Sequence, residues 1–295
     1  MKDKKRQEDK PYLELTLSDE TGRMASRILL FHLSLDAEIP ISLGYIAAAL
    51  RKRNINTALE YITPNELKDH KQIFNLIQKF QPNIVGFSAY QFSISEILLV
   101  ANLIKKTNCK IITIIGGPQA TFMPKEALWE MPSIDVLCRG EGEVVLPSIA
   151  ECLNNSKDLA TVKNIAFKKG DILIETEQEE FKKDLDDFPS PYQLGIFNLP
   201  NYKRGIILAS RGCPFRCHFC YTPNAFHHTI RYHSPERILG DLYVCIKNNI
   251  RDFFFADPIL TFNREWVIKI MRGIIRKGWK IKIWCETRTD LVDKE

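Results

Sequence analysis

The chain has 295 residues, enough for about two domains that each bury a core, and its 45% hydrophobic and 26% charged residues are ordinary for a globular protein. The formal net charge of +5 is small and dispersed, which argues against a nucleic-acid partner, and we interpret residues 1–26 as a flexible charged tail. No secretory signal precedes the first predicted strand, and no apolar run approaches the roughly 18 residues of a membrane helix. We therefore expect a cytoplasmic protein with no membrane partner.

Residues 27–155 alternate short apolar runs with amphipathic stretches, which predicts strands that alternate with helices. Pro40 suits the first turn of a helix, and Ser93 with Glu96 three residues later predicts a capping box. The expected strands are 27–33, 56–62, 83–89, 110–115 and 134–138, and the expected helices are 41–53, 66–80, a helix that begins at 93, 124–131 and 143–153. This order predicts an α/β fold with a five-stranded, doubly wound parallel sheet.

Ligands of such sheets bind at the carboxyl ends of the strands, near the point where the strand order reverses. The stretches SLDAEIP, SAYQFS and GGPQA follow the first, third and fourth predicted strands. Gly116 and Gly117 either let a bulky ligand approach the backbone or only form a tight turn. The first strand is not followed by G-x-G-x-x-G, so we do not expect a dinucleotide site.

The order and spacing of four segments resemble the cobalamin-binding domain at the front of many radical S-adenosylmethionine enzymes: IPISLGYIAAALRKRN, QPNIVGFSA, IIGGPQAT and IDVLCRGEGEVVLPSI. The resemblance covers residues 27–155 and implies a Rossmann-like domain with a corrinoid across the carboxyl edge of its sheet. The positions that correspond to the corrinoid site are Ser34, Ser88, Tyr90, Gln91, Gly116, Gly117 and Pro118, and the RGEGE motif includes Arg139, Gly140 and Glu141. The loop after the first strand lacks the family's lower axial histidine, and we interpret His32 as a packed strand residue, so we expect no protein histidine below the cobalt.

Residues 156–203 form the predicted connection. The segment VKNIAFKKGDILIE predicts a hairpin that turns at residues 169–171, because Gly and Asp suit tight turns. The charge runs and two prolines that follow are typical of a linker, which places the domain boundary near residues 187–192.

The second half begins with the predicted strand GIILAS, which leads directly into RGCPFRCHFC. Cys213, Cys217 and Cys220 would therefore lie at the carboxyl end of a strand, where α/β barrels hold their chemistry. In a reducing cytoplasm, clustered thiols indicate metal, cluster or redox ligands. Three thiolates are one short of the four that ordinarily hold an iron–sulfur cluster, which would leave one iron open. A zinc site is the alternative, but it would need a fourth ligand, and this spacing matches no common zinc pattern. The other cysteines, which we interpret as small buried hydrophobes, are Cys109, Cys138, Cys152 and Cys245.

The Cys-x3-Cys-x2-Cys motif, with Phe219 before its third cysteine, resembles the radical S-adenosylmethionine signature. The resemblance implies a 4Fe-4S cluster on these cysteines, whose open iron chelates S-adenosylmethionine and whose electron cleaves it to a 5′-deoxyadenosyl radical. The resemblance also implies cofactor-binding residues at the ends of the next two predicted strands. They are Ala256, Asp257 and Pro258 after the second strand of this half, and Glu286 and Arg288 after the third. Asp257 could equally be a turn or capping residue, and we interpret Cys285 as a packing residue.

From residue 204 the chain supplies three strands of a family barrel that is built from six strand and helix units. We therefore expect residues 204–295 to be the amino-terminal half of that partial barrel, with an unpaired edge strand. The resemblance implies an enzyme that cleaves S-adenosylmethionine, and methyl transfer from cobalamin to an unreactive carbon is the favoured reaction. The open alternatives are cyclisation or rearrangement, a non-catalytic corrinoid-binding or partner subunit, and a zinc-stabilised interaction protein. The implied partners are a substrate, an electron donor such as flavodoxin or ferredoxin, and a chain that supplies the rest of the barrel.

Overall fold

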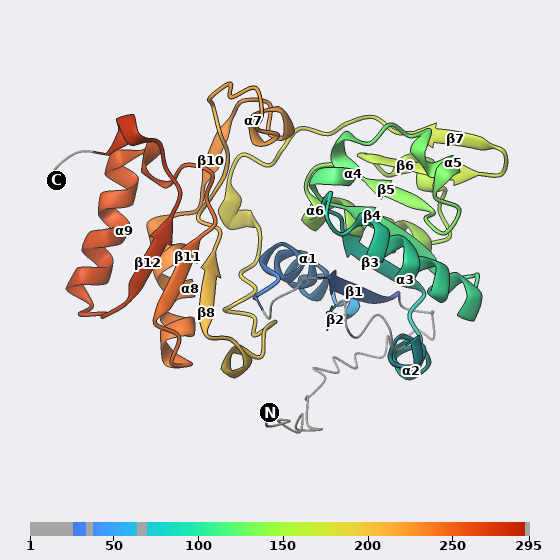
Figure 1. Ribbon diagram of the computed structural model, residues 1–295, viewed down its shortest axis with the longest axis horizontal. Coiled ribbons are helices and arrows are strands. Elements are labelled where there is room, and N and C mark those ends of the chain that lie inside the picture. The colour runs from blue at the N-terminus through green and yellow to red at the C-terminus, as the bar shows by residue number, and fades with distance from the viewer. Residues whose placement is uncertain (1–25, 34–37, 64–69, 293–295) are drawn as a thin grey trace.

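The structure, a computed structural model, describes residues 26–33, 38–63 and 70–292. Two groups of strands lie side by side along the long axis of the molecule, and helix α1 (Ile41–Lys52) lies at their junction (Figure 1). The predicted tail up to residue 25 and the predicted site residue Ser34 lie outside the described residues. Within the described part of the chain, no helix is both long enough and apolar enough to cross a membrane.

The first sheet has seven strands in the order β2-β1-β3-β4-β5-β6-β7. Its strands are β1 (Arg27–Leu33), β2 (Asn56–Ile62), β3 (Ile84–Ser88), β4 (Ile112–Gly116), β5 (Val136–Cys138), β6 (Ile165–Lys169) and β7 (Ile172–Glu175). The strands from β1 to β5 are parallel, and β1 pairs with β2 on one side and with β3 on the other. The strand order therefore reverses between β1 and β3, which is where a doubly wound sheet opens its binding crevice.

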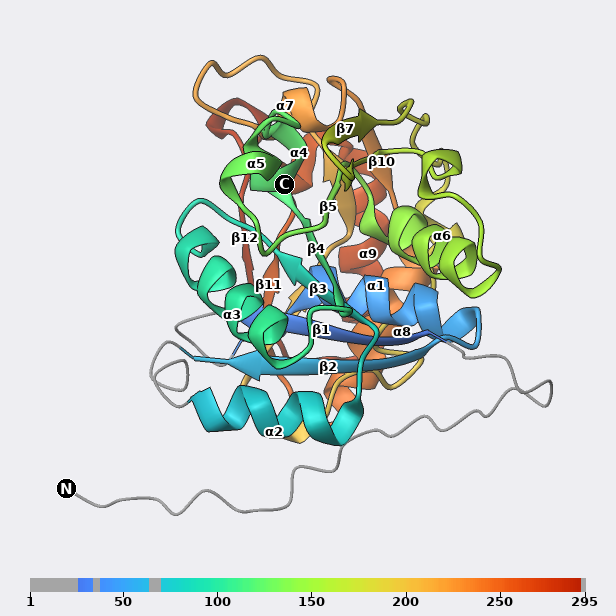
Figure 2. The same ribbon diagram turned by 90° about the vertical axis from the view of Figure 1, so that its right-hand side faces the viewer.

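Helices cover both faces of this sheet, as Figure 2 shows. Besides α1, they are α2 (His70–Phe80), α3 (Ile94–Thr107), α4 (Pro118–Phe122), α5 (Ala127–Glu130) and α6 (Gly142–Asn154). One core packs α2 and α3 against side chains such as Phe31, and the other packs α1 and α6 against side chains such as Leu30. Successive residues of β1 thus enter opposite cores, because side chains alternate across a strand.

Two sequence predictions for this half are wrong in detail. The sheet is seven-stranded and not five-stranded, because the hairpin of β6 and β7 joins its edge antiparallel to β5 and does not belong to a loose connection. The capping box at Ser93 is absent: its hydroxyl donates to the carbonyl of Tyr90 and accepts from the Tyr90 amide, so it closes the turn before α3. The five predicted parallel strands are all present.

The second group contains a parallel sheet in the order β12-β11-β8 and a two-stranded hairpin of β9 and β10. Its elements are β8 (Arg204–Ile207), β9 (Ser210–Gly212), α7 (Thr222–Ala225), β10 (Ile230–Tyr232), α8 (Pro235–Lys247), β11 (Asp252–Phe255), α9 (Arg264–Arg276) and β12 (Lys282–Cys285). Short 3-10 turns lie at Leu159–Thr161, Leu185–Asp187, Leu199–Asn201, Leu260–Phe262 and Thr289–Leu291. One apolar core packs α8 and α9 against the three parallel strands.

The predicted strand GIILAS is divided in two. It ends as β8 at Ile207, and Ser210 begins the separate strand β9, which pairs antiparallel with β10. The cysteine loop therefore follows a hairpin strand and not the barrel strand itself. The predicted start of α8 is confirmed, because the Ser234 hydroxyl accepts a hydrogen bond from the Arg237 amide at 3.1 Å.

Buried polar contacts join the two groups at α1. The Tyr45 hydroxyl lies 3.2 Å from His233 Nε2, and His233 Nδ1 lies 2.9 Å from an Asp186 carboxylate oxygen. Burial lowers the pKa of His233 to about 4, so its ring is neutral at pH 7. Because a carboxylate only accepts hydrogen bonds, Nδ1 donates to Asp186 and Nε2 accepts from Tyr45. These contacts fix the angle between the two halves.

Candidate functional site

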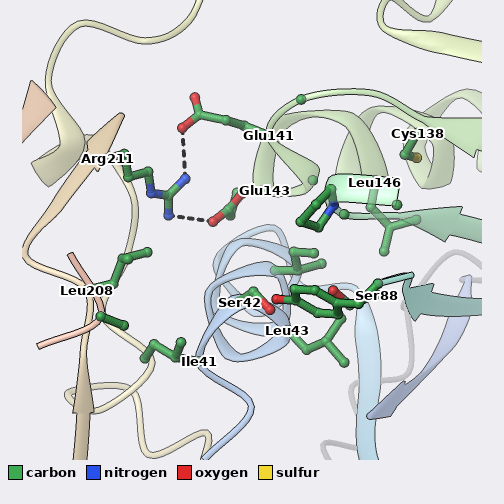
Figure 3. Close-up of a pocket in the computed structure, with 18 of the residues that line it drawn as sticks. Ile41, Ser42, Leu43, Ser88, Cys138, Glu141, Glu143, Leu146, Leu208 and Arg211 are labelled. Atoms are coloured by element: carbon green, nitrogen blue, oxygen red, sulfur yellow. Dashed lines mark hydrogen bonds and ion pairs between the residues drawn. The ribbon is translucent and has the colours of Figure 1, made fainter. Parts of the chain in front are cut away.

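A cavity of about 310 Å³ lies at the junction. It lies at the carboxyl ends of the strands of both sheets, so the two ligand-binding edges of the molecule face one space. Figure 3 shows how side chains from α1, α6 and the segment around β9 point toward it. On the side of the first sheet its edge is lined by Ser88, Tyr90, Gly116, Gly117, Pro118, Gly140, Glu141, Gly142 and Glu143, and on the other side by Leu208, Ser210, Arg211, Gly212, Tyr221, Thr222, Phe226, Ala256 and Pro258.

Sequence reasoning placed several of these residues in two different cofactor sites. The structure brings Ser88, Tyr90 and the Gly116–Pro118 turn into the same cavity as Ala256 and Pro258. Their assignment to particular cofactors stays a prediction. What the structure adds is that one pocket joins the edge of the first sheet to the mouth of the second.

The turn at Gly117 is required by the backbone itself. Its φ is +90° and its ψ is −174°, a region that is essentially restricted to glycine. A Cβ atom at this position would lie 3.0 Å from the Ala89 carbonyl oxygen. The tight-turn interpretation of Gly117 therefore holds whether or not a ligand is bound, and the same turn leaves the cavity wall without a side chain.

The inner wall of the cavity is apolar. Side chains of both sheet and helices contribute to it, among them Leu30, Leu43, Ile46, Ile114 and Leu146. The polar groups of the lining come from both halves, for example Ser42 and Ser88 from the first and Ser210 from the second. A pocket with an apolar wall and a few polar groups suits a large organic ligand more than a hydrated ion.

The three predicted cluster cysteines lie on the loop between β9 and α7. Cys213, Cys217 and Cys220 are partly buried free thiols, and the Cys220 amide donates a hydrogen bond to the Cys217 carbonyl at 3.0 Å. The loop also presents Phe219, whose side chain is 93% exposed. The neighbouring residues Arg211, Gly212, Tyr221 and Thr222 at the two ends of this loop line the cavity.

Arg288, which the sequence placed at the barrel mouth, contacts this loop. Its guanidinium carbon lies 4.0 Å from the centre of the Phe215 ring. The pKa of Arg288 is raised, first by its hydrogen bond to Asp290 and also by the charges of Cys217 and Cys213. The positive charge of Arg288 therefore lies beside the cysteine loop.

The donor set of the loop fits an iron–sulfur cluster in kind, because it offers three soft thiol ligands and a nearby cation. The side chains are not gathered into a ready metal site: across the described ranges, no group of three or more His, Cys, Asp or Glu side chains is arranged to hold a metal ion. Neighbouring His218, His227 and His228 are exposed, and His233 is committed to the interface. A metal would have to draw the loop together, as is usual for sites that form with binding.

Asp257 is buried and not directed into the cavity. Its carboxylate accepts hydrogen bonds from the Ser210 hydroxyl at 2.5 Å and from the Ala209 amide at 3.3 Å. Burial raises its pKa to about 7, although these hydrogen bonds oppose the rise. It therefore ties the end of β11 to the start of β9, and its assignment to cofactor binding stays a prediction.

The remaining predicted residues lie apart from the cavity lining. Gln91, Glu286 and Arg288 are exposed, and Arg139 is a buried structural residue that donates to the carbonyls of Thr121 and Met123. Two predictions for the other cysteines are also wrong: Cys109 and Cys285 are exposed, because they lie in a turn and on an edge strand. Cys138, Cys152 and Cys245 are buried as predicted.

Sequence reasoning missed Glu143, Arg211 and the residues of α1 that line the cavity. Glu143 and Arg211 form a buried ion pair with Nη2 to Oε1 at 2.6 Å. The available signal was the pair of carboxylates in RGEGE and the arginine just before the first cysteine, but no local pattern shows that these segments meet.

A family model described as B12 binding domain matches residues 31–150. This segment is therefore similar to B12-binding domains. The matched segment begins within β1 and ends within α6, so it includes the strand-order reversal described above. The α/β fold with a mostly parallel sheet that the sequence predicted is thereby confirmed.

Curated relatives resemble the chain over most of its length, including the part that follows the B12-binding domain. An uncharacterized methyltransferase from Pyrococcus horikoshii is 27% identical over 262 residues, which are 87% of this chain and 56% of that protein. The anaerobic magnesium-protoporphyrin IX monomethyl ester cyclase of Cereibacter sphaeroides is 28% identical over 265 residues, which are 86% of this chain and 43% of that protein. The chain spans about half the length of the curated relatives it matches.

A solved structure shares the fold of both halves. The radical S-adenosylmethionine methyltransferase TsrM from Kitasatospora setae, solved with tryptophan and a SAM analog, aligns with a TM-score of 0.72 and 18% identity over 88% of this chain and 54% of that chain. A second structure of the same enzyme holds cobalamin and a [4Fe-4S] cluster. The family resemblance drawn from the sequence is confirmed by these comparisons.

Proposed function

We propose that this chain carries the cobalamin site and the cluster site of a radical S-adenosylmethionine methyltransferase. The single observation that carries the proposal is the cavity into which both strand edges open, because it puts the predicted corrinoid edge and the predicted S-adenosylmethionine segment in contact with one space. Methyl transfer is the favoured reaction because the relatives include methyltransferases. A reaction that passes a group from one cofactor to another needs such a shared space.

The cofactors would divide the site between them. Cys213, Cys217 and Cys220 would hold the cluster, the Ala256–Pro258 segment would contact S-adenosylmethionine, and the edge from Ser88 to Pro118 would hold the corrinoid. When bound, the cluster supplies the electron that cleaves S-adenosylmethionine, and cobalamin supplies a methyl group. The protein's own contribution is to position these groups and to exclude water from them.

Several features of the chain suit that contribution. The apolar wall formed by Leu30, Leu43 and Leu146 keeps water from the inner side of the cavity. Arg288 places a positive charge beside the cysteine loop. The Gly117 turn lets a flat macrocycle approach the backbone at the edge of the sheet.

Partners follow from the same proposal. The cluster requires an electron donor, which we propose to be a small redox protein such as flavodoxin or ferredoxin. Among the residues that the structure describes, β12 pairs only with β11, and we propose that further barrel strands, from this protein or from a partner chain, pair with its other edge.

Cyclisation on the same cofactors is a second candidate. It is favoured by the 28% identity to the magnesium-protoporphyrin IX monomethyl ester cyclase, which is as close as the identity to the methyltransferase. Product analysis separates the two reactions, because a methyltransferase adds one carbon to its substrate and a cyclase adds none.

The first test is cofactor content. The chain is reconstituted anaerobically with iron and sulfide, incubated with hydroxocobalamin and desalted, and its iron, sulfide, zinc and cobalamin are measured. We expect about four irons per chain and bound cobalamin. The triple variant Cys213→Ala/Cys217→Ala/Cys220→Ala should lose the iron and keep the cobalamin, because the two sites lie on different halves.

The matched control is Cys109→Ala/Cys285→Ala, which removes two exposed thiols outside the loop. It should retain the full iron content. Zinc in place of iron, or iron that survives the triple substitution, would show that the loop is not a cluster site and would end the proposal.

A further inference from the structure

The strongest unexplained feature is a buried ion pair system across the two halves, which we call the clasp and define as Arg211, Glu141 and Glu143. Arg211 Nη1 lies 2.8 Å from Glu141 Oε1, and Nη2 lies 2.6 Å from Glu143 Oε1. The three side chains are only 5 to 7% exposed. Figure 3 shows the arginine reaching from β9 toward both carboxylates at the start of α6.

Aromatic rings and a second arginine enclose the clasp. The Arg211 guanidinium carbon lies 5.1 Å from the centre of the Tyr45 ring and 4.9 Å from that of Phe188. Glu141 also pairs with Arg231, at 2.8 Å, and Arg231 stands opposite Arg211 in the hairpin. The orientation of the arginine is therefore fixed from several directions.

Stability alone does not account for such an arrangement. The free energy needed to desolvate two charges is about as large as the attraction between them in the interior. Apolar residues of similar size would therefore stabilise the interface at least as well. A buried ion pair does impose one geometry, because only one placement satisfies all its partners. The clasp therefore fixes the position of β9 relative to the start of α6.

Those segments are the cavity wall and the cysteine loop. All three clasp residues line the cavity. Arg211 stands two residues before Cys213, and Gly212 between them has a φ of +89° and would place a Cβ 2.2 Å from the Thr229 carbonyl oxygen. The backbone from the clasp to the first thiol is thus short and tightly packed.

We propose that Arg211 is a positioning residue that fixes the cysteine loop relative to the corrinoid edge. A ligand in the cavity would then reduce the mobility of the loop. This inference rests on the proposed function. A corrinoid in the cavity would contact the segment of Glu141 and Glu143 at the start of α6 and hold it in place. Because both carboxylates pair with Arg211, the backbone that leads to Cys213 would be held in place as well. Loss of the arginine uncouples the two sites without removing the ligands of either.

The test measures hydrogen–deuterium exchange of residues 211–222 in the full chain without a cluster, with and without cyanocobalamin. In the wild type, cyanocobalamin should slow exchange of this segment about tenfold. Arg211→Met should bind cyanocobalamin and show no slowing, and Arg211→Lys should restore part of it. The double variant Arg211→Met/Glu143→Gln has one buried unpaired charge fewer than Arg211→Met, so it should fold even if the single variant does not. It should also lack the response.

Arg237→Met is the matched control, because Arg237 is also an ion-paired arginine over the Tyr45 ring, with its side chain 11% exposed, but does not line the cavity. It should keep the response. A normal response in an Arg211→Met protein that binds cyanocobalamin would overturn the clasp proposal alone. A wild type that binds neither iron nor corrinoid would overturn the proposed function and the clasp proposal with it.

Discussion

The buried carboxyl group of Asp257 should make the free energy of unfolding depend on pH. Its pKa is about 7 in the fold against an ordinary value of 3.8, because burial disfavours the charged form. As pH rises between these two values, the unfolded chain loses this proton before the folded chain does. The free energy of unfolding should therefore fall across that window and level off above about pH 7, by a total on the order of a few kcal/mol.

Asp257→Asn should remove this pH dependence. Asparagine stays neutral, and its carbonyl oxygen can still accept from the Ala209 amide. The measurement is the urea midpoint of wild type and variant at about pH 4.5 and about pH 7.5. We expect the urea midpoint of the wild type to fall between the lower and the higher pH, and the midpoint of the variant to change less. The variant should therefore gain stability relative to the wild type at the higher pH. Equal pH slopes would show that Asp257 is ionised in the fold.

At the scale of the element, the start of α8 is a test of capping. The Ser234 hydroxyl accepts from the Arg237 amide, one of the four amides that a helix leaves without a partner. Ser234→Ala should lower the free energy of unfolding by about 1 kcal/mol, as measured by urea denaturation. The exposed Ser95→Ala on α3 is the control and should change it by less than about 0.5 kcal/mol. An effect at Ser234 no larger than that at Ser95 would contradict the cap.

The elements also show what local patterns can and cannot predict. Apolar runs located β1 and β2 to the residue and predicted every parallel strand. In β1 the signal is a continuous apolar run, because its central residues are buried on both faces. The pairing of β6 with β5 could not be predicted, because a strand's partner depends on distant residues. Ser93 failed as a cap for a related reason: its hydroxyl had a closer backbone partner at Tyr90.

At the scale of the whole molecule, the site exists because two halves meet. The motif around Cys213 and the edge near Gly117 could be recognised separately in the sequence, but their opening into one cavity could not. The same holds for Arg211, whose two carboxylate partners lie 70 and 68 residues earlier in the chain. Contacts of this kind depend on domain packing, and no periodicity records them.

The cavity itself gives the last prediction. Ser42 of α1 lines it, as Figure 3 shows, and Ser42→Trp would place an indole where the corrinoid edge is proposed. We expect this variant to bind hydroxocobalamin at least about tenfold more weakly, a cost of about 1.4 kcal/mol, and to keep its full iron content. Ser95→Trp adds the same ring at an exposed position outside the lining and should bind as the wild type does. Unchanged affinity in Ser42→Trp, measured by spectroscopic titration, would mean that the corrinoid binds elsewhere, and the cavity would then be left to S-adenosylmethionine and substrate.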